Sequence, residues 1–150
     1  MKNEKLKIIQ ETTEQLLENL KIKAAVKVSE GEEVFQVQIE TADTEILIGY
    51  HGETLASFQI ILSLMVYKKL GNWLRLIVNI GDYRQRREEA LRQMAYASAE
   101  KVIATGEAIT LPYLSSFERR IIHLILVDHP QVTTISEGEG EGRKLIIKPR

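Results

Sequence analysis

The chain has 150 residues, 44% of them hydrophobic and 27% charged, which is the composition of one or two folded domains rather than of a disordered segment. Its 20 basic and 21 acidic side chains nearly cancel, so any basic surface for a polyanion must be local. The absence of cysteine excludes disulfides and thiolate chemistry. No apolar run approaches the roughly 18 residues of a membrane span, and the first 15 residues hold no signal-peptide core, which predicts a cytoplasmic protein.

Residues 1–80 alternate between helical and extended patterns, with apolar residues recurring every three or four positions or every second position. The predicted elements are a helix to about residue 20, strands at 22–29 and 34–40, helices at 43–48 and 53–70, and a strand at 73–80. The polar "EGEE" between the first two strands predicts a hairpin turn, and Gly71 is expected to end the longer helix. The order is helix, strand, strand, helix, helix, strand.

A second unit is expected to begin near Gly81, so we divide the chain into domains at 1–80 and 81–150. Its predicted elements are a helix from Asp82 to about residue 105, a loop with Pro112, a helix from Ser115 to about Val127, and strands at 131–136 and 143–149. Ser115 and Glu118 have capping-box spacing, and Gly106 is expected to end the helix that precedes it. The "EGEGEG" segment between the last strands predicts a mobile hairpin loop.

The first candidate site is "GYHG", the segment from Gly49 to Gly52 that joins two predicted helices. Glycines allow a nucleic-acid backbone to approach closely, and the start of the following helix offers free amides and the positive end of its dipole. Tyr50 can stack on a base, and His51 adds charge when it is protonated. An isolated G-x-x-G is more often an ordinary turn, so its place between the helices carries the argument.

A second group of candidates lies on the last predicted helix. Arg119 and His123 are four residues apart, which makes them neighbours on the helix surface, and Arg120 lies beside them. We expect an apolar face with an apolar flank around this basic window. The face comprises Phe117, Ile121, Leu124 and Ile125, and the flank comprises Ile122 and Leu126. Two hypotheses remain open: the window binds nucleic acid, or Arg119 pairs with a carboxylate such as Glu118 or Asp128 while His123 is structural.

Arg84 and Arg87 are expected on the inward side of the preceding helix, near its start. Either residue can anchor the two halves of the chain through ion pairs, or extend the basic window into a groove along a nucleic-acid strand. We favour the anchoring role for Arg84 and treat Arg87 as a candidate nucleic-acid-binding residue.

The segment 1–80, with Gly49-Tyr50-His51-Gly52 in the G-x-x-G position, resembles a bacterial-type (type II) KH domain. It departs from the KH pattern because no Lys or Arg stands between the glycines. "FERRIIH" with "TTISEGEGEGRKLIIKP" resembles the R-3-H domain, named for its Arg-x-x-x-His motif, with Arg119 and His123 in the motif positions. The pair of domains in this order resembles the Jag, SpoIIIJ-associated or KhpB-like family. Many family members carry an N-terminal Jag domain, which we expect to be missing because the KH helix begins almost at Met1.

This resemblance implies an α+β fold, a type II KH domain followed by a small α/β R-3-H domain. It also implies a non-catalytic protein of the bacterial cytoplasm that binds single-stranded RNA or DNA, as a post-transcriptional regulator or RNA chaperone, without a cofactor. Family members are linked to cell division and envelope synthesis, often with a small KH-only partner protein. The scattered histidines predict neither a metal site nor a catalytic one.

The alternative is a protein-interaction adaptor built on degenerate nucleic-acid-binding domains. Residues 1–80 hold nine basic against eleven acidic side chains, a net of −2, and residues 81–150 hold eleven against ten, a net of +1. Neither half is strongly basic, so RNA binding must rest on a few placed arginines, on stacking and on backbone amides.

Overall fold

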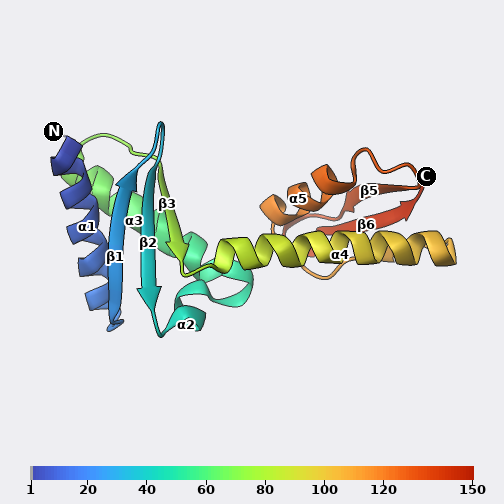
Figure 1. Cartoon of the computed structure of the whole chain (residues 1–150), viewed down its shortest axis with the longest axis horizontal. Helices are drawn as coiled ribbons and strands as arrows, with labels where there is room; N and C mark the ends of the chain where they lie inside the picture. The colour runs from blue at the N-terminus through green and yellow to red at the C-terminus, as the bar shows by residue number, and fades with distance from the viewer. Residues whose placement is uncertain (1) are drawn as a thin grey trace. The chain divides into compact units, whose positions relative to one another are not determined.

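A computed structural model describes residues 2–150, which form two compact units divided between Arg84 and Gln85 (Figure 1). The elements in chain order are α1 (Lys2–Asn19), β1 (Ala24–Glu30), β2 (Phe35–Thr41), α2 (Thr44–Ile48), a 3-10 turn η1 (Tyr50–Gly52), α3 (Glu53–Leu70), β3 (Leu76–Ile80), α4 (Tyr83–Thr105), β4 (Ile109–Thr110), α5 (Ser116–Leu126), β5 (Val132–Glu137), a 3-10 turn η2 (Gly140–Gly142) and β6 (Lys144–Pro149). The helix-strand-strand-helix-helix-strand order predicted for the first unit is confirmed.

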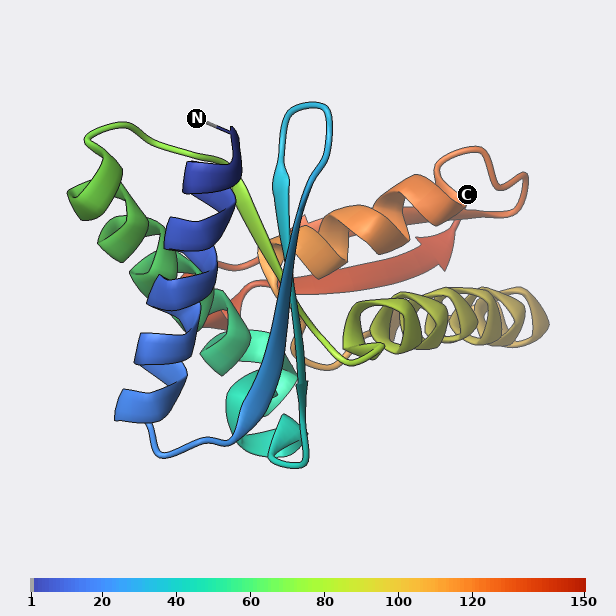
Figure 2. The same cartoon turned by 60° about the vertical axis from the view of Figure 1, so that its left-hand side comes forward.

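The first unit is a three-stranded sheet in the order β1-β2-β3, with α1 and α3 packed against one face of it (Figure 2). Strand β2 runs antiparallel to β1 and parallel to β3. The parallel pair requires a crossover, and α2 and α3 provide it. The G-x-x-G segment therefore lies inside this crossover, between the two helices.

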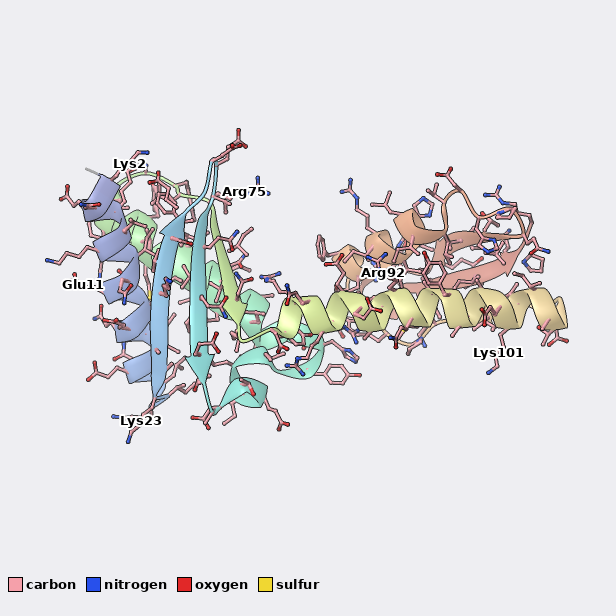
Figure 3. The ribbon with its side chains drawn as sticks, in the orientation of Figure 1. Lys2, Glu11, Lys23, Arg75, Arg92 and Lys101 are labelled. Atoms are coloured by element: carbon pink, nitrogen blue, oxygen red, sulfur yellow. The ribbon has the colours of Figure 1, made fainter. Side chains whose placement is uncertain are left out.

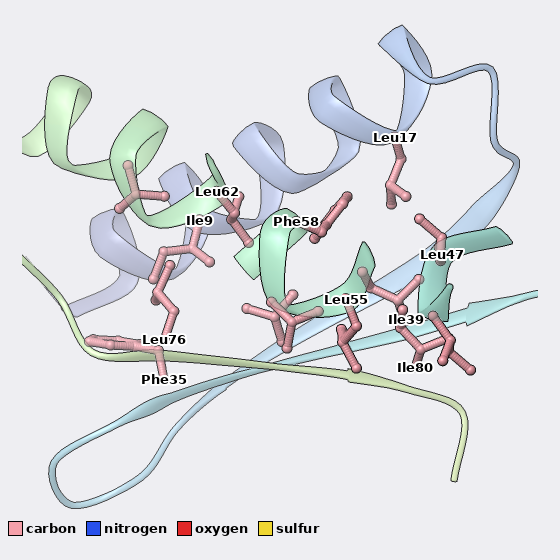
Figure 4. Packing of buried hydrophobic residues seen from close by; sticks show 14 residues of the cluster. Ile9, Leu17, Phe35, Ile39, Leu47, Leu55, Phe58, Leu62, Leu76 and Ile80 are labelled. Atoms are coloured by element: carbon pink, nitrogen blue, oxygen red, sulfur yellow. The ribbon is translucent and has the colours of Figure 1, made fainter. Parts of the chain in front are cut away.

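The core of the first unit lies between α1, α3 and the sheet (Figure 4). Ile9 of α1, Ile39 of β2 and Leu62 of α3 have no exposed surface. The labelled core residues come from five elements: Ile9, Leu17, Phe35, Ile39, Leu47, Leu55, Phe58, Leu62, Leu76 and Ile80. Each fully buried side chain of this size contributes about 1.5–3 kcal/mol through the hydrophobic effect, so this cluster fixes the position of α3 on the sheet.

The second unit has a smaller antiparallel sheet in the order β4-β6-β5, with the core between one sheet face and the helices α4 and α5. Its fully buried members include Ala95 of α4, Ile122 of α5 and Ile147 of β6. The β5–β6 hairpin is confirmed. Strand β4, which has only two residues, lies in the segment predicted as a loop, because a strand this short produces no alternating pattern.

The predicted ends of two helices in the second unit are confirmed. Gly106 has φ 72° and donates its N–H to the carbonyl oxygen of Val102, which closes α4. Ser115 and Glu118 form a complete capping box at the start of α5, with each side chain accepting from the other residue's N–H at 3.1 Å.

The predicted apolar face of α5 is wrong in part. Ile122 and Leu126, expected as a flank, are the buried residues, whereas the side chains of Phe117 and Leu124 are 68% and 58% exposed. Apolar residues occur almost all round this helix, so its sequence does not select one face. The position of the sheet selects it.

Charged side chains of both signs project from both units, as Lys2, Glu11 and Lys23 do in the first unit and Arg92 and Lys101 do on α4 (Figure 3). Positive and negative side chains are thus mixed on the surface of each unit, and neither unit carries one sign alone. None of the helices in residues 2–150 combines the length and apolarity that crossing a membrane requires.

Candidate nucleic-acid interface

Arg119 lies one turn into α5, and its side chain is only 9% exposed. Its Nη1 donates to the carbonyl oxygens of Leu114, at 2.7 Å, and Arg143, at 3.4 Å. Its Nη2 donates to Oγ of Ser116 at 3.0 Å. These oxygens hold the guanidinium in one orientation beside the helix start, and they carry no formal charge.

The positive charge of Arg119 is therefore not neutralised by an ion pair. Within residues 2–150 no carboxylate forms one with Arg119 or with Arg120. The sequence left open that Glu118 pairs with Arg119, but Glu118 is directed to Arg87 instead. Burying an unpaired charge is expensive, so this guanidinium is a candidate group for stabilising a bound anion.

His123 lies one turn after Arg119 and is exposed. Its Nδ1 lies 2.6 Å from Oγ1 of Thr134 on β5, a hydrogen bond whose direction depends on the imidazole tautomer. This bond connects α5 to the sheet and leaves Nε2 as the ring nitrogen available to a ligand. The predicted pair of Arg119 and His123 is thus brought to one side of α5.

An open pocket of about 540 Å³ lies beside this pair, between α5 and the strands β5 and β6. Its lining residues are Ser116, Arg119, Arg120, His123, Thr134, Ser136, Arg143 and Leu145. Three of them are arginines, four others can form hydrogen bonds, and none is a carboxylate. A pocket with this lining suits an anion with several oxygen atoms, such as a phosphodiester group.

Five of these residues were not singled out from the sequence: Ser116, Thr134, Ser136, Arg143 and Leu145. A signal for two of them was present. Val132, Thr134 and Ser136 alternate along β5, so they share the sheet face that packs on the helices. Hydroxyl groups at two inward positions of one strand indicate a polar site there rather than continuous core.

The capping box also positions the pocket. Glu118, 6% exposed, accepts a hydrogen bond from Arg87 Nε on α4 at 2.6 Å while it caps α5. The two helices are therefore joined at the residue that precedes Arg119. Arg87 is occupied in this ion pair and is not among the pocket-lining residues, so we leave it out of the proposed site.

Arg84 is likewise not among the residues that line this pocket. Its Nε and Nη2 donate to the carbonyl oxygen of Val78, at 3.1 and 3.0 Å, and Nη2 also contacts Oε1 of Gln59 at 3.2 Å. Partial burial of the guanidinium lowers the pKa of Arg84 from its ordinary value, and the Tyr83 hydroxyl opposes this shift. These contacts hold the guanidinium of Arg84 against β3 and α3 within the first unit, and the hypothesis that Arg84 anchors the two halves of the chain through ion pairs stays a prediction.

The G-x-x-G loop has an unusual backbone. Gly49 has φ 69° and ψ −171°, a conformation essentially restricted to glycine, and a Cβ at this position would lie 2.0 Å from Oγ1 of Thr54. His51 and Gly52 also have positive φ, 51° and 80°. Only glycine fits at position 49, and the fold holds the loop in a conformation that is rare for an ordinary turn.

The side chains between the two glycines face solvent to different extents. Tyr50 is 67% exposed, His51 is half-buried, and the two rings meet edge to face with centroids 4.0 Å apart. A Cβ on Gly52 would lie 3.2 Å from the hydroxyl oxygen of Tyr83. The loop therefore offers an aromatic ring and backbone amides, but its inner edge is bordered by Tyr83.

Among residues 2–150 no cluster of three or more His, Asp or Glu side chains is arranged to hold a metal ion.

The family comparisons assign both units. Residues 7–80 match the KH domain of KhpA/KhpB, and residues 89–149 match the R-3-H domain. The class of protein is therefore a KH domain followed by an R-3-H domain, the pair and the order that the sequence resemblance implied.

Similarity to characterised proteins extends over most of the chain. It is 36% identical over 129 residues to the RNA-binding protein KhpB of Clostridium symbiosum, a match that covers 86% of this chain and 58% of that protein. It is 34% identical over 127 residues to the RNA-binding protein KhpB of Bacillus subtilis, a match that covers 83% of this chain and 61% of that protein. It is 30% identical over 135 residues to the RNA-binding protein KhpB of Lactiplantibacillus plantarum, a match that covers 90% of this chain and 42% of that protein. The chain belongs to the KhpB-like family, and it spans about half the length of the curated relatives it matches.

Proposed function

We propose that this chain binds single-stranded RNA without catalysis, and that the pocket of the R-3-H domain is its principal phosphate-binding site. The observation that carries the proposal is the buried guanidinium of Arg119, which has only neutral oxygen partners and opens onto a pocket without carboxylates. The relatives named RNA-binding proteins favour RNA over DNA as the ligand.

The KH domain takes the second place in this proposal. Its loop has the glycine geometry of a phosphate-contacting turn, but it presents Tyr50 and His51 where a basic side chain would strengthen the contact. We therefore assign it base stacking and backbone amide contacts to the same strand. The loop adds affinity to the R-3-H domain rather than replacing it.

A salt titration with a short single-stranded RNA tests the phosphate site. Binding measured by fluorescence anisotropy should weaken as the salt concentration rises, because phosphate contacts release counterions. Arg120→Ala should reduce the slope of log K against log salt by about 0.7, one contact on a single strand, and weaken binding about tenfold. Arg120 is exposed, so the substitution should leave the fold unchanged.

Arg92→Ala is the matched control. Arg92 also lies in the second unit, has a 47% exposed side chain and forms ion pairs with Glu88 and Glu89 of its own helix. The Arg92→Ala substitution removes the same charge at a position outside the pocket, so it should change neither the RNA affinity nor the slope of log K against log salt. If the wild-type chain shows no salt-dependent binding at low ionic strength, the RNA-binding proposal is abandoned in favour of the adaptor function.

One observation favours a protein-binding function beside RNA binding. Helix α3 and the segment after it expose a group of large apolar side chains: Ile60 (62%), Ile61 (47%), Leu64 (47%), Tyr67 (36%) and Trp73 (59%). Such a group on one helix is larger than the scattered apolar residues of an ordinary surface. We propose that this surface of α3 binds a small KH-only protein.

The charges on α3 agree with a partner of the same fold. Glu53 stands in the first turn and Lys68 in the last turn of the exposed side. Two such helices in antiparallel contact bring each acidic start against a basic end, with the apolar residues between them. Leu64→Glu should abolish a complex with a KH-only protein in size-exclusion chromatography, whereas Leu20→Glu, at a 50% exposed position after α1, should preserve it. Loss of the complex in both variants, or in neither, would remove the support for this surface.

The cellular setting follows from resemblance alone. We propose that the chain acts in the bacterial cytoplasm as a post-transcriptional regulator or RNA chaperone, in the control of cell division and envelope synthesis. Crosslinking and sequencing of RNA bound in cells tests this, because the bound transcripts should be enriched in messages for those processes.

A further inference from the structure

Helix α5 carries a second surface, which borders the pocket and which the phosphate-binding site does not use. Phe117, Leu124 and Val127 are 68%, 58% and 44% exposed. Phe117 and Leu124 are seven residues apart, about two helical turns, and Val127 follows three residues later, so the three side chains share one side of the helix. We call these three residues the α5 shelf.

The α5 shelf and the pocket share an edge. Arg120 lies three residues after Phe117 and four before Leu124, so it is a surface neighbour of both along the helix. Arg120 also lines the pocket together with Ser116 and His123. Moving round the helix from the cationic, hydrogen-bonding lining of the pocket, one therefore passes Val127 and then Arg120 before reaching Leu124 and Phe117.

A nucleotide has the same two parts, an anionic phosphate and an apolar ring with stacking faces, held a short distance apart by the sugar. We propose that the α5 shelf receives the bases of the strand whose phosphate occupies the pocket, with Phe117 stacking on one base and Leu124 and Val127 contacting the next. This inference rests on the proposed RNA-binding function and makes Phe117 the residue that selects single strands, because bases in a duplex are already stacked and cannot lie on a helix surface.

A partner protein is the other class of occupant for exposed apolar residues. The α5 shelf favours bases because Arg120, a guanidinium that is exposed and forms no ion pair in the described chain, divides the apolar strip and would be desolvated under a helix packed across it. A strand of nucleic acid keeps that charge beside a phosphate, so the same arginine strengthens its binding.

Two oligonucleotides separate the roles of the two surfaces. One is a short single-stranded RNA, and the other is an oligomer with the same phosphates but abasic at every internal position. Phe117→Ala should weaken binding of the RNA about tenfold without changing its salt slope, since stacking on an aromatic residue is worth about 1–3 kcal/mol per base. The same variant should bind the abasic oligomer as wild type does, and Phe117→Tyr should restore RNA binding.

Ile103→Ala is the matched control, because Ile103 is a 41% exposed apolar residue on α4 and belongs to neither surface. It should bind both oligomers normally. The shelf assignment is overturned if Phe117→Ala binds RNA like wild type, if it weakens both oligomers equally, or if Ile103→Ala has the same effect. If RNA binding is salt-dependent but unchanged by Phe117→Ala, only the assignment of the α5 shelf is overturned. If the wild-type chain shows no salt-dependent binding, the proposed function is overturned as well.

Discussion

His123 and Thr134 are joined by a hydrogen bond of 2.6 Å between Nδ1 and Oγ1, which spans from α5 to β5 at the wall of the pocket. Thr134 is nearly buried, at 9% exposure, so water competes little for this bond. The threonine thereby determines both the orientation of the imidazole and which ring nitrogen a ligand can reach.

Thr134→Val should release the histidine while it preserves the shape of the core. We expect a loss of stability of about 1 kcal/mol, the net worth of one hydrogen bond, and a several-fold loss of RNA affinity. Urea denaturation measures the first and anisotropy the second. Thr133→Val, at the neighbouring position on the opposite sheet face, is the control and should leave RNA affinity unchanged. Equal affinities for all three proteins would show that the orientation of His123 does not contribute.

Arg119 stabilises the fold through its hydrogen bonds, whereas Arg120 is exposed, and substitutions at the two positions should therefore differ in their effect on stability. Arg119→Ala leaves the carbonyl oxygen of Leu114 and the hydroxyl of Ser116 without their donor, so unfolding should become easier by about 2 kcal/mol. Arg120→Ala should weaken RNA binding with no change in stability. A thermal denaturation curve for each variant checks this difference. If Arg119→Ala unfolds at the wild-type temperature, the carbonyl contacts do not stabilise the fold.

Arg87 provides the complementary case, since its ion pair with Glu118 is structural. Arg87→Ala leaves a nearly buried carboxylate without its cation, and we expect a destabilisation of about 3 kcal/mol. At a temperature where the variant is folded, its salt slope for RNA binding should equal that of wild type. If the salt slope of the variant is instead smaller by about 0.7, Arg87 contacts a phosphate and belongs to the binding site.

The G-x-x-G loop gives a gain-of-function prediction. Replacing Tyr50 and His51 with Lys and Arg places two permanent positive charges in the loop, and RNA binding should tighten and become more salt-dependent. The position of His51 accepts a side chain at positive φ already, so the fold should tolerate the change. The same substitution combined with Gly49→Ala should lose the gain, because the loop geometry is destroyed. An unchanged affinity of the double substitution would mean that this loop does not reach the ligand.

The features that the sequence predicted are those with causes close by in the chain. The capping box depends on two residues three positions apart, and the turn at Gly106 on one residue, so both follow from local chemistry. The pairing of Arg119 with His123 follows from helical spacing alone. These features do not depend on which surface the helix meets.

The features that were missed or wrong depend on contacts distant in sequence. Thr134 joins the site only because β5 packs beside α5, and the backbone carbonyl of Arg143 reaches Arg119 across 24 positions. Phe117 and Leu124 were placed on an apolar face because the helix is apolar almost all round. The sheet position that decides between its faces cannot be obtained from the helix itself.

In the KH loop, Gly49 determines the backbone conformation and the two residues after it determine the charge. The left-handed turn is formed before any ligand arrives, so contact with a strand freezes few additional backbone torsions and the entropic cost of association stays small. Gly49 is fixed by this requirement, because Thr54 occupies the space of its side chain, and Gly52 is constrained by its φ of 80°. The loop geometry does not set the charge of the two residues that follow Gly49, so substitutions at these two positions can raise or lower the phosphate affinity of the loop while the backbone turn is kept.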